Sequence, residues 1–160
     1  MNVWGAVAGG FVGTIVLTTA LRAASELDFT RMDLPFLLGT AFSADRTRAK
    51  ALGYLLHFVV GECFAFVYYG VFLAIGHSGW GLGAAFGLLH GLFASTALVS
   101  VLLPIIHPRM GTADSSAADR PLLERPGFMM LNYGARTPLV TLLSHVSYGA
   151  IVGGFISLAS

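Results

Sequence analysis

Charged residues are scarce in this sequence of 160 residues, where Asp, Glu, Lys and Arg together make up 11%. Apolar residues make up 56% and the mean hydropathy is +0.77, which excludes an ordinary water-soluble domain and indicates a membrane protein. The only cysteine, Cys63, excludes an intrachain disulfide and is expected to be a small buried apolar residue. The net charge of +1 and the lack of a basic patch predict no nucleic-acid binding.

Familiar catalytic motifs are missing as well. The chain has no glycine-rich phosphate loop, no paired-cysteine metal site, no His-Glu zinc motif on a helix and no nucleophile elbow. A serine near a histidine is too common a pairing to indicate a hydrolase. The residues therefore favour a non-enzymatic protein.

What the sequence does contain is four apolar runs, each long enough to cross about 30 Å of hydrocarbon as a helix. Backbone amides cannot stay unpaired in lipid, so such runs form helices, and they are too long for barrel strands. We therefore expect one all-α domain over residues 1–160, an integral membrane four-helix bundle. Its spans are predicted at about residues 2–23, 51–76, 81–106 and 138–159.

The basic residues predict the orientation of this bundle. All nine Lys and Arg lie in or beside the first and third loops, and the two tails and the short second loop have none. By the positive-inside rule, those two loops are cytoplasmic and both termini lie outside. Trp4 and Trp80 then both lie at the outer interface, where the indole ring is favoured.

Both cytoplasmic loops contain apolar segments. Residues 32–40 are too apolar for a free linker and too short to span, so we expect an interfacial or re-entrant turn with Pro35 in the first turn of a short helix. In the third loop, Thr137 before Pro138 predicts a helix N-cap. His77 and His107 are expected to be solvated at the two interfaces.

Small residues mark the faces on which helices pack in lipid, because association there depends on close backbone approach. The first span carries glycines at intervals of four, and the second and fourth spans carry glycine pairs. We expect the first set to pack inside the bundle rather than against a second protomer. The helix-packing residues predicted in this way are Gly5, Gly9, Gly13, Gly53, Gly61, Gly149 and Gly153.

One acid and three histidines lie well inside the spans and are the candidate functional residues: His57, Glu62, His90 and His145. A rise of about 1.5 Å per residue places His57 and His145 at one level and His90 about 12 Å or more further out. Glu62, turned about 140° from His57, is expected to point into the bundle or an oligomer seam rather than to share a site with it.

Two classes of function follow from these residues. The first is a subunit, scaffold or assembly module of a membrane complex, or a homo-oligomer, held together by the glycine faces. The second is a histidine-lined site at His57, His90 and His145 that binds a transition metal or haem or relays protons. In the simplest alternative the imidazoles only hydrogen-bond facing helices.

Three short motifs carry a resemblance to a known group. They are Met32-Asp33-Leu34-Pro35 with Gly39-Thr40, His57-Phe58 with Gly61 and Phe64-Ala65, and His145 with Tyr148-Gly149-Ala150. In these the chain resembles a broad group of small four-helix bacterial inner-membrane proteins of uncharacterised function. The resemblance implies a bacterial inner-membrane location and the same four-span plan, and supplies no activity, cofactor or catalytic residue.

Overall fold

The four expected spans are confirmed as helices. The computed structural model describes residues 1–110 and 123–159, and within them it contains four helices that are long and apolar enough to cross a membrane. These are α1 (Val3–Glu26), α3 (Arg46–Ile75), a composite of α4 (Trp80–Phe93), η1 (Ala94–Leu102) and α5 (Leu103–Ile106), and α6 (Thr137–Leu158). The described residues are thus all-helical, and four of their helices are candidate membrane spans.

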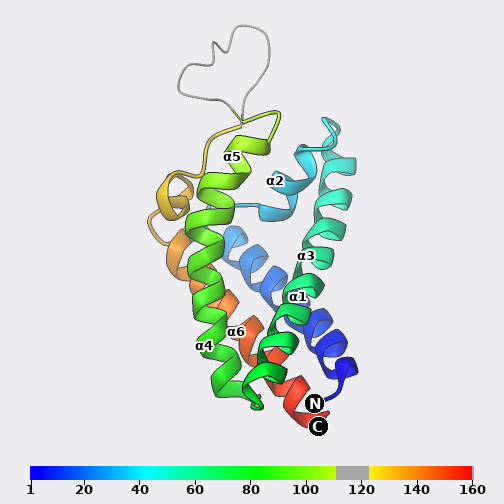
Figure 1. Cartoon of the computed structure of the whole chain (residues 1–160). Coiled ribbons are helices and arrows are strands. Elements are labelled where there is room, and N and C mark those ends of the chain that lie inside the picture. The colour runs from blue at the N-terminus through cyan, green and yellow to red at the C-terminus, as the bar shows by residue number, and fades with distance from the viewer. Residues whose placement is uncertain (111–122, 160) are drawn as a thin grey trace, which may run out of the picture.

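The molecule has two distinct ends (Figure 1). Both termini and the turn between α3 and α4 lie at one of them, which we call the terminal end. The short helices α2 (Leu34–Thr40) and η2 (Phe128–Tyr133) lie toward the opposite end, the loop end, together with α5.

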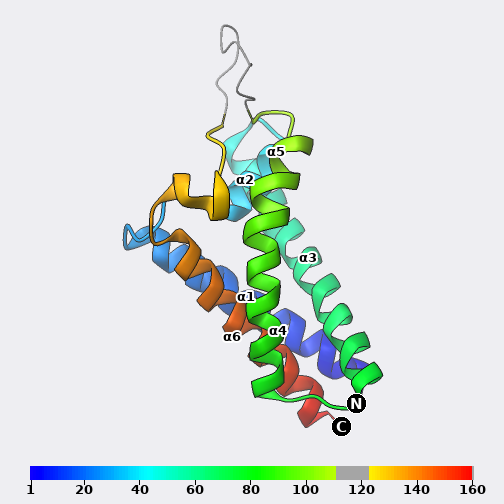
Figure 2. The same cartoon turned by 60° about the vertical axis from the view of Figure 1, so that its left-hand side comes forward.

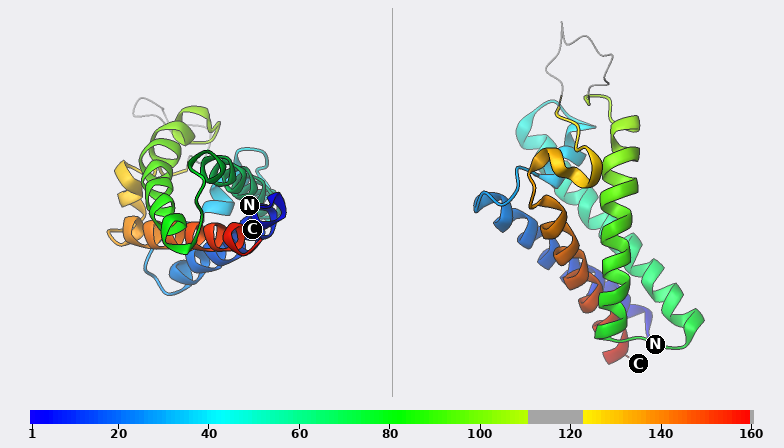
Figure 3. Two further views of the ribbon diagram at one scale, coloured as in Figure 1. Left: turned by 60° about the horizontal axis from the view of Figure 1, so that its bottom comes forward. Right: turned by 90° about the vertical axis from the view of Figure 1, so that its left-hand side faces the viewer.

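The long helices are not parallel. α1 and α6 lie side by side and are inclined to the α4–η1–α5 helix, so that α6 begins nearer the middle of the molecule than α5 ends (Figure 2). α4 packs on α6, α6 on α1, and α1 on α3. α2 packs on α3 and lies between α3 and the α4–η1–α5 helix (Figures 1 and 3).

Side-chain caps fix where three helices begin. The side chain of Asn2 accepts a hydrogen bond from the backbone N–H of Trp4, and those of Asp33 and Asp45 do the same at α2 and α3. Because Asp45 is the cap, α3 starts five residues before the predicted span. Thr137 is not the expected N-cap but the first residue of α6, and its hydroxyl bonds Thr30 instead, at 2.7 Å.

The third span contains a π-helix, η1, where a continuous α-helix was expected. Three hydroxyl groups in it donate to backbone carbonyls: Ser95 and Thr96 to Leu92, and Ser100 to Ser95 at 2.5 Å. Pro104 lacks an N–H, so the carbonyl four residues before it has no α-helical donor. Both features favour a local change in the hydrogen-bonding pattern of the helix backbone. π-Helical turns are often found at functional sites.

Glycines allow α6 to pack closely on two helices at once. A Cβ added at Gly5, Gly9 or Gly13 of α1 would lie 2.7–3.0 Å from residues 148–156 of α6. On the other side of α6, a Cβ at Gly149 or Gly153 would collide with the backbone of residues 79–87. The matching glycines there, Gly79, Gly83, Gly87 and Gly91, show the same spacing of four and were overlooked in the sequence.

α2 and α3 approach each other even more closely. A Cβ at Gly39 of α2 would overlap the carbonyl of Ala49, and one at Gly53 of α3 would overlap the carbonyl of Pro35. Two backbones in direct contact leave no space for any side chain between them.

Candidate ligand-binding cavity

A cavity of about 440 Å³ lies among α1, α3, η1 and α6, and we call it the histidine cavity. Most of its wall is aliphatic and aromatic, as is typical of small-molecule sites of this size. Its polar wall residues are Thr14, His57, His90, Thr141, His145 and Tyr148. The structure therefore brings together three of the four predicted candidate residues.

His90 and His145 are in direct contact, with ring centroids 4.8 Å apart in an edge-to-face arrangement. The predicted separation in depth of about 12 Å was wrong. It assumed that the spans end at one level, whereas α5 extends well beyond the start of α6. His57 lies close enough to both rings for charges on them to interact, and Phe64 stacks on His90 at 3.8 Å.

The Nδ1 atoms of two rings are held by hydroxyl groups. Nδ1 of His57 lies 3.1 Å from Thr18 Oγ1, and Nδ1 of His90 lies 3.4 Å from the hydroxyl of Tyr68. Neither hydroxyl has another hydrogen-bond partner within the described residues. Thr18 of α1 thus orients the imidazole of His57, and Tyr68 of α3 orients that of His90.

The third ring is held by its own helix. Nδ1 of His145 donates to the carbonyl oxygen of Thr141 at 2.8 Å. Within residues 1–110 and 123–159, the Nε2 atoms of the three rings have no hydrogen-bond partner. None of these Nε2 atoms is fully enclosed by protein. Because all three rings line the cavity, three unbonded imidazole nitrogens are presented to it.

Other polar atoms of the cavity wall are also unsatisfied. Oγ1 of Thr14 and Oγ1 of Thr141 are buried without a hydrogen-bond partner among the described residues. The hydroxyl of Tyr148 donates to the carbonyl of Gly61 at 2.5 Å, and Gly61 has no room for a Cβ because Thr14 Oγ1 lies against it. Buried groups left without partners cost about 1–3 kcal/mol each. Because both Thr Oγ1 atoms are enclosed by protein, they add to this cost without offering a hydrogen bond to the cavity.

The geometry does not favour a metal or haem. No three His, Cys, Asp or Glu side chains in the described part of the chain are placed to hold a metal ion. A haem between two imidazoles needs its iron at about 2 Å from each nitrogen, with the porphyrin plane between the rings. The contact between His90 and His145 leaves no such space.

Glu62 lies outside the histidine cavity, in the seam between α1 and α3. Its Oε2 atom is enclosed there, near Gly10 and Ala65, and has no hydrogen-bond partner in the described residues. The adjacent Cys63 does line the cavity but is exposed, so the expectation of a buried cysteine was wrong. Cys63 thus lies on the exposed side of α3, whereas the neighbouring Gly61 and Ala65 are buried.

The cavity opens sideways between α3 and the η1–α5 segment. Four of its wall residues are also exposed on the outer surface: Val60 and Cys63 on α3, and Leu102 and Ile106 on the opposite side. Direct contacts between α3 and the third span lie nearer the terminal end, where Tyr68 and Phe72 meet Phe86. The two helices therefore separate toward the loop end and leave an apolar mouth.

Two buried methionines close the loop end of the cavity: Met32, which precedes α2, and Met130 in η2. Met129 and Met130 both have positive φ, 48° and 61°, a conformation that costs roughly 1–2 kcal/mol per residue. Such backbone strain persists only where the surrounding contacts impose it.

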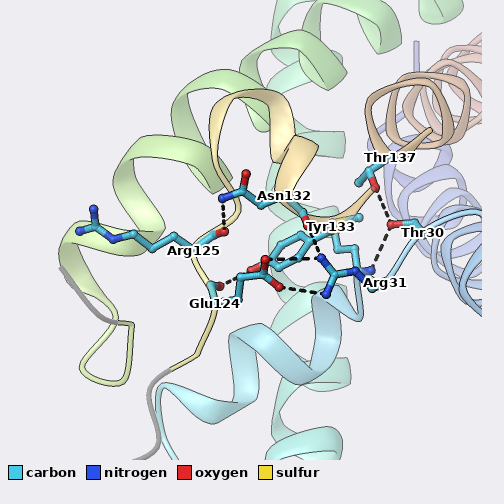
Figure 4. A network of polar contacts seen from close by, with 8 residues as sticks. Thr30, Arg31, Glu124, Arg125, Asn132, Tyr133 and Thr137 are labelled. Carbon is cyan, nitrogen blue, oxygen red and sulfur yellow. Dashed lines mark hydrogen bonds and ion pairs between the residues drawn. The ribbon is translucent and has the colours of Figure 1, made fainter. Parts of the chain in front are cut away.

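Those contacts form a polar network beside η2 (Figure 4). The guanidinium of Arg31 pairs with Glu124 at 3.1 Å and donates to the carbonyl of Asn132. The backbone N–H of Arg31 donates to the carbonyl of Tyr133 at 2.8 Å. Thr30 joins the network to α6 through Thr137. The network thus holds Met32 and Met130 in place at the loop end of the cavity.

His107 was expected to be solvated, but it is 3% exposed. Its Nε2 lies 3.0 Å from the carbonyl oxygen of Leu37, and its Nδ1 accepts from the backbone N–H of Arg109 at 3.1 Å. The guanidinium of Arg109 donates to the carbonyl of Thr40. Together with the hydroxyl of Thr40, which donates to the same Leu37 carbonyl at 2.8 Å, these donors bond carbonyls in the last turn of α2.

A second, smaller pocket of about 100 Å³ lies beside the first at the loop end. Its charged residues are paired, Arg22 with Glu26 at 2.6 Å and Lys50 with Asp33 at 3.7 Å. The pocket therefore carries no net charge that would select an anion. It adjoins Thr18, the residue behind His57.

The phenol of Tyr133 should lose its proton at an unusually high pH. Burial, and next the charge of Glu124, raise the pKa of Tyr133 to about 12 from its ordinary value of 10, and Arg31 partly opposes the shift. Its neutral form thus contributes stability that is complete below pH 10 and is lost as the pH rises toward 12. We expect Tyr133→Phe to reduce the loss of thermal stability over this interval. Absorbance titrations of the two proteins check this. If the transition that Tyr133→Phe removes lies near pH 10, the prediction is contradicted.

Comparison with known proteins adds no identification: no family model, curated protein or solved structure matches the chain.

Proposed function

We propose that this protein is a membrane-embedded binding protein for a small amphiphilic molecule that enters the histidine cavity from the bilayer. The observation that carries this proposal is the combination of an apolar cavity with an apolar lateral mouth and unbonded imidazole nitrogens. A ligand with an apolar chain would contact the aliphatic wall, and a polar group on it would meet the histidines. The glycine contacts supply the rigid framework that holds these residues in place.

The alternative, a subunit, scaffold or assembly module, rests on the exposed apolar faces of the helices. A lipid bilayer alone accounts for such faces, so they indicate no protein partner. The histidine-lined site has specific geometric support. Among its versions a ligand site is favoured over a metal because no three His, Cys, Asp or Glu side chains of the described residues are placed to hold one. A haem held between His90 and His145 is disfavoured because these two rings touch. Homo-oligomerisation stays a prediction.

The test blocks the cavity without changing the fold. Leu98→Trp adds volume at a wall position, and Leu89→Trp places the same ring at a residue that is 61% exposed on the outside of α4. We expect native mass spectrometry of protein extracted in mild detergent to show a co-purified amphiphile with the wild type and Leu89→Trp. Leu98→Trp should lack it. Equal retention by both variants, or no bound amphiphile on the wild type, would contradict the proposal.

We further propose that the protein lies in a bacterial inner membrane with its loop end in the cytoplasm and both termini outside. The distribution of Lys and Arg supports this orientation. In a Cys63→Ser background, a cysteine introduced by Ser78→Cys should react with a membrane-impermeant maleimide added to intact spheroplasts. A reaction seen only after the membrane is opened would reverse the orientation.

A further inference from the structure

The hydrogen-bonding roles of two histidines follow from their neighbours. The hydroxyl hydrogens of Thr18 and Tyr68 have no acceptor other than Nδ1 of His57 and His90 among the described residues. Within the described residues, each hydroxyl therefore finds an acceptor for its hydrogen only in that Nδ1. A neutral imidazole whose Nδ1 accepts carries its proton on Nε2. His57 and His90 thus offer N–H donors to the cavity.

His145 has the opposite role. Its Nδ1 faces the carbonyl oxygen of Thr141 at 2.8 Å, and a carbonyl can only accept, so the proton is on Nδ1. Nε2 of His145 then carries a lone pair and accepts a hydrogen bond from within the cavity. Because His90 and His145 are in contact, the donor and the acceptor lie side by side.

The site that these rings form is neutral. None of the described residues that line the histidine cavity is Asp, Glu, Lys or Arg. The charge pairs at the loop end, those of the smaller pocket and that of Arg31 with Glu124, are each internally neutral. An ionised head group would have to be buried without a counter-charge, which is costly. The cavity therefore selects a neutral polar group.

We infer that the ligand is an apolar chain that ends in a hydroxyl group, either a long-chain alcohol or a fatty acid in its neutral form. This inference rests on the proposed function and names the class of molecule bound. The O–H group donates to Nε2 of His145, and oxygen lone pairs of the same head accept from Nε2–H of His57 and His90. An ester or ketone has acceptors only, so it leaves the His145 nitrogen without a donor.

The test compares four probes that share one chain: hexadecanol, hexadecanoic acid, methyl hexadecanoate and hexadecane. The full-length protein is placed in phosphatidylcholine nanodiscs, and bound probe is measured by native mass spectrometry over a concentration series. Because one lost hydrogen bond is worth about a tenfold change in affinity, we expect the alcohol, the acid or both to bind about tenfold more tightly than the ester. Binding of only one of them identifies which head the protein recognises.

A variant assigns the preference to His145. His145→Phe keeps an aromatic ring of similar shape and removes the acceptor, so the alcohol or acid should lose about tenfold in affinity while binding of the ester stays unchanged. Equal affinities of ester, alcohol and acid for the wild type, all abolished by Leu98→Trp, would overturn this inference and leave the proposed function standing. Failure of all four probes to bind would overturn both. The wild-type comparison does not depend on the folding of any variant.

Discussion

Gly39→Ala should disrupt the loop end of the protein and lower its free energy of unfolding by about 3 kcal/mol or more. The added Cβ would overlap the backbone carbonyl of Ala49, and a backbone carbonyl in the first turn of α3 cannot move aside as a flexible side chain can. α2 would have to leave α3. This would also expose Met32 and Leu34, which cover the histidine cavity.

The matched control is the same substitution in open space. Gly70 of α3 has nothing within 4 Å of an added Cβ, so Gly70→Ala should be neutral or stabilise the helix by up to about 1 kcal/mol. Thermal unfolding in one detergent, followed by circular dichroism and by retention on size exclusion, measures both variants. If Gly39→Ala and Gly70→Ala unfold at the same temperature, α2 is not packed on α3 as described.

Gly87→Ala should have the second-largest effect, a loss of about 2–3 kcal/mol together with loss of ligand binding. The new Cβ would collide with the carbonyl oxygen of His145, so α4 and α6 would have to separate. That separation moves His90 away from His145 and divides the donor from the acceptor. Gly87 is thus predicted to affect ligand binding indirectly, because it sets the distance between the rings of His90 and His145.

Gly81→Ala is the control for this prediction because it lies on the same helix with nothing within 4 Å. It should leave both the unfolding temperature and ligand retention at wild-type values, whereas Gly87→Ala should lower both. A Gly87→Ala protein that kept full stability and full binding would show that α4 and α6 do not depend on this close approach.

The sequence predicted the helical class well because the hydrocarbon thickness imposes a simple rule. About 20 apolar residues between charged segments are required, and this requirement is local in the chain. Helix ends were less certain, since Asp45 extends α3 beyond its apolar part. The signal for the α4 glycines was available at the same spacing as Gly5, Gly9 and Gly13, and it predicts packing without naming the partner helix.

The histidine cavity could be predicted only in part. Sequence alone indicated that His57, His90 and His145 are unusual, because polar residues are costly within a span. It could not bring His90 to His145, because their relative depth depends on the tilt of α6 and on the extra length of α5. It also could not find Thr18, Tyr68 or Met130, since a hydroxyl or a thioether in an apolar sequence carries no signal of its own.

What the sequence by itself determined is therefore the number of long apolar helices and which polar residues lie within them, since both follow from the cost of placing charge and open backbone in lipid. The tertiary structure decided the rest: the close contact of α2 with α3, the burial of His107, the separation of α3 from η1 and the contact between two imidazoles. These features depend on helix tilt and on glycine contacts between residues far apart in the chain. A cavity is the space that such contacts leave, so no single segment of sequence specifies it.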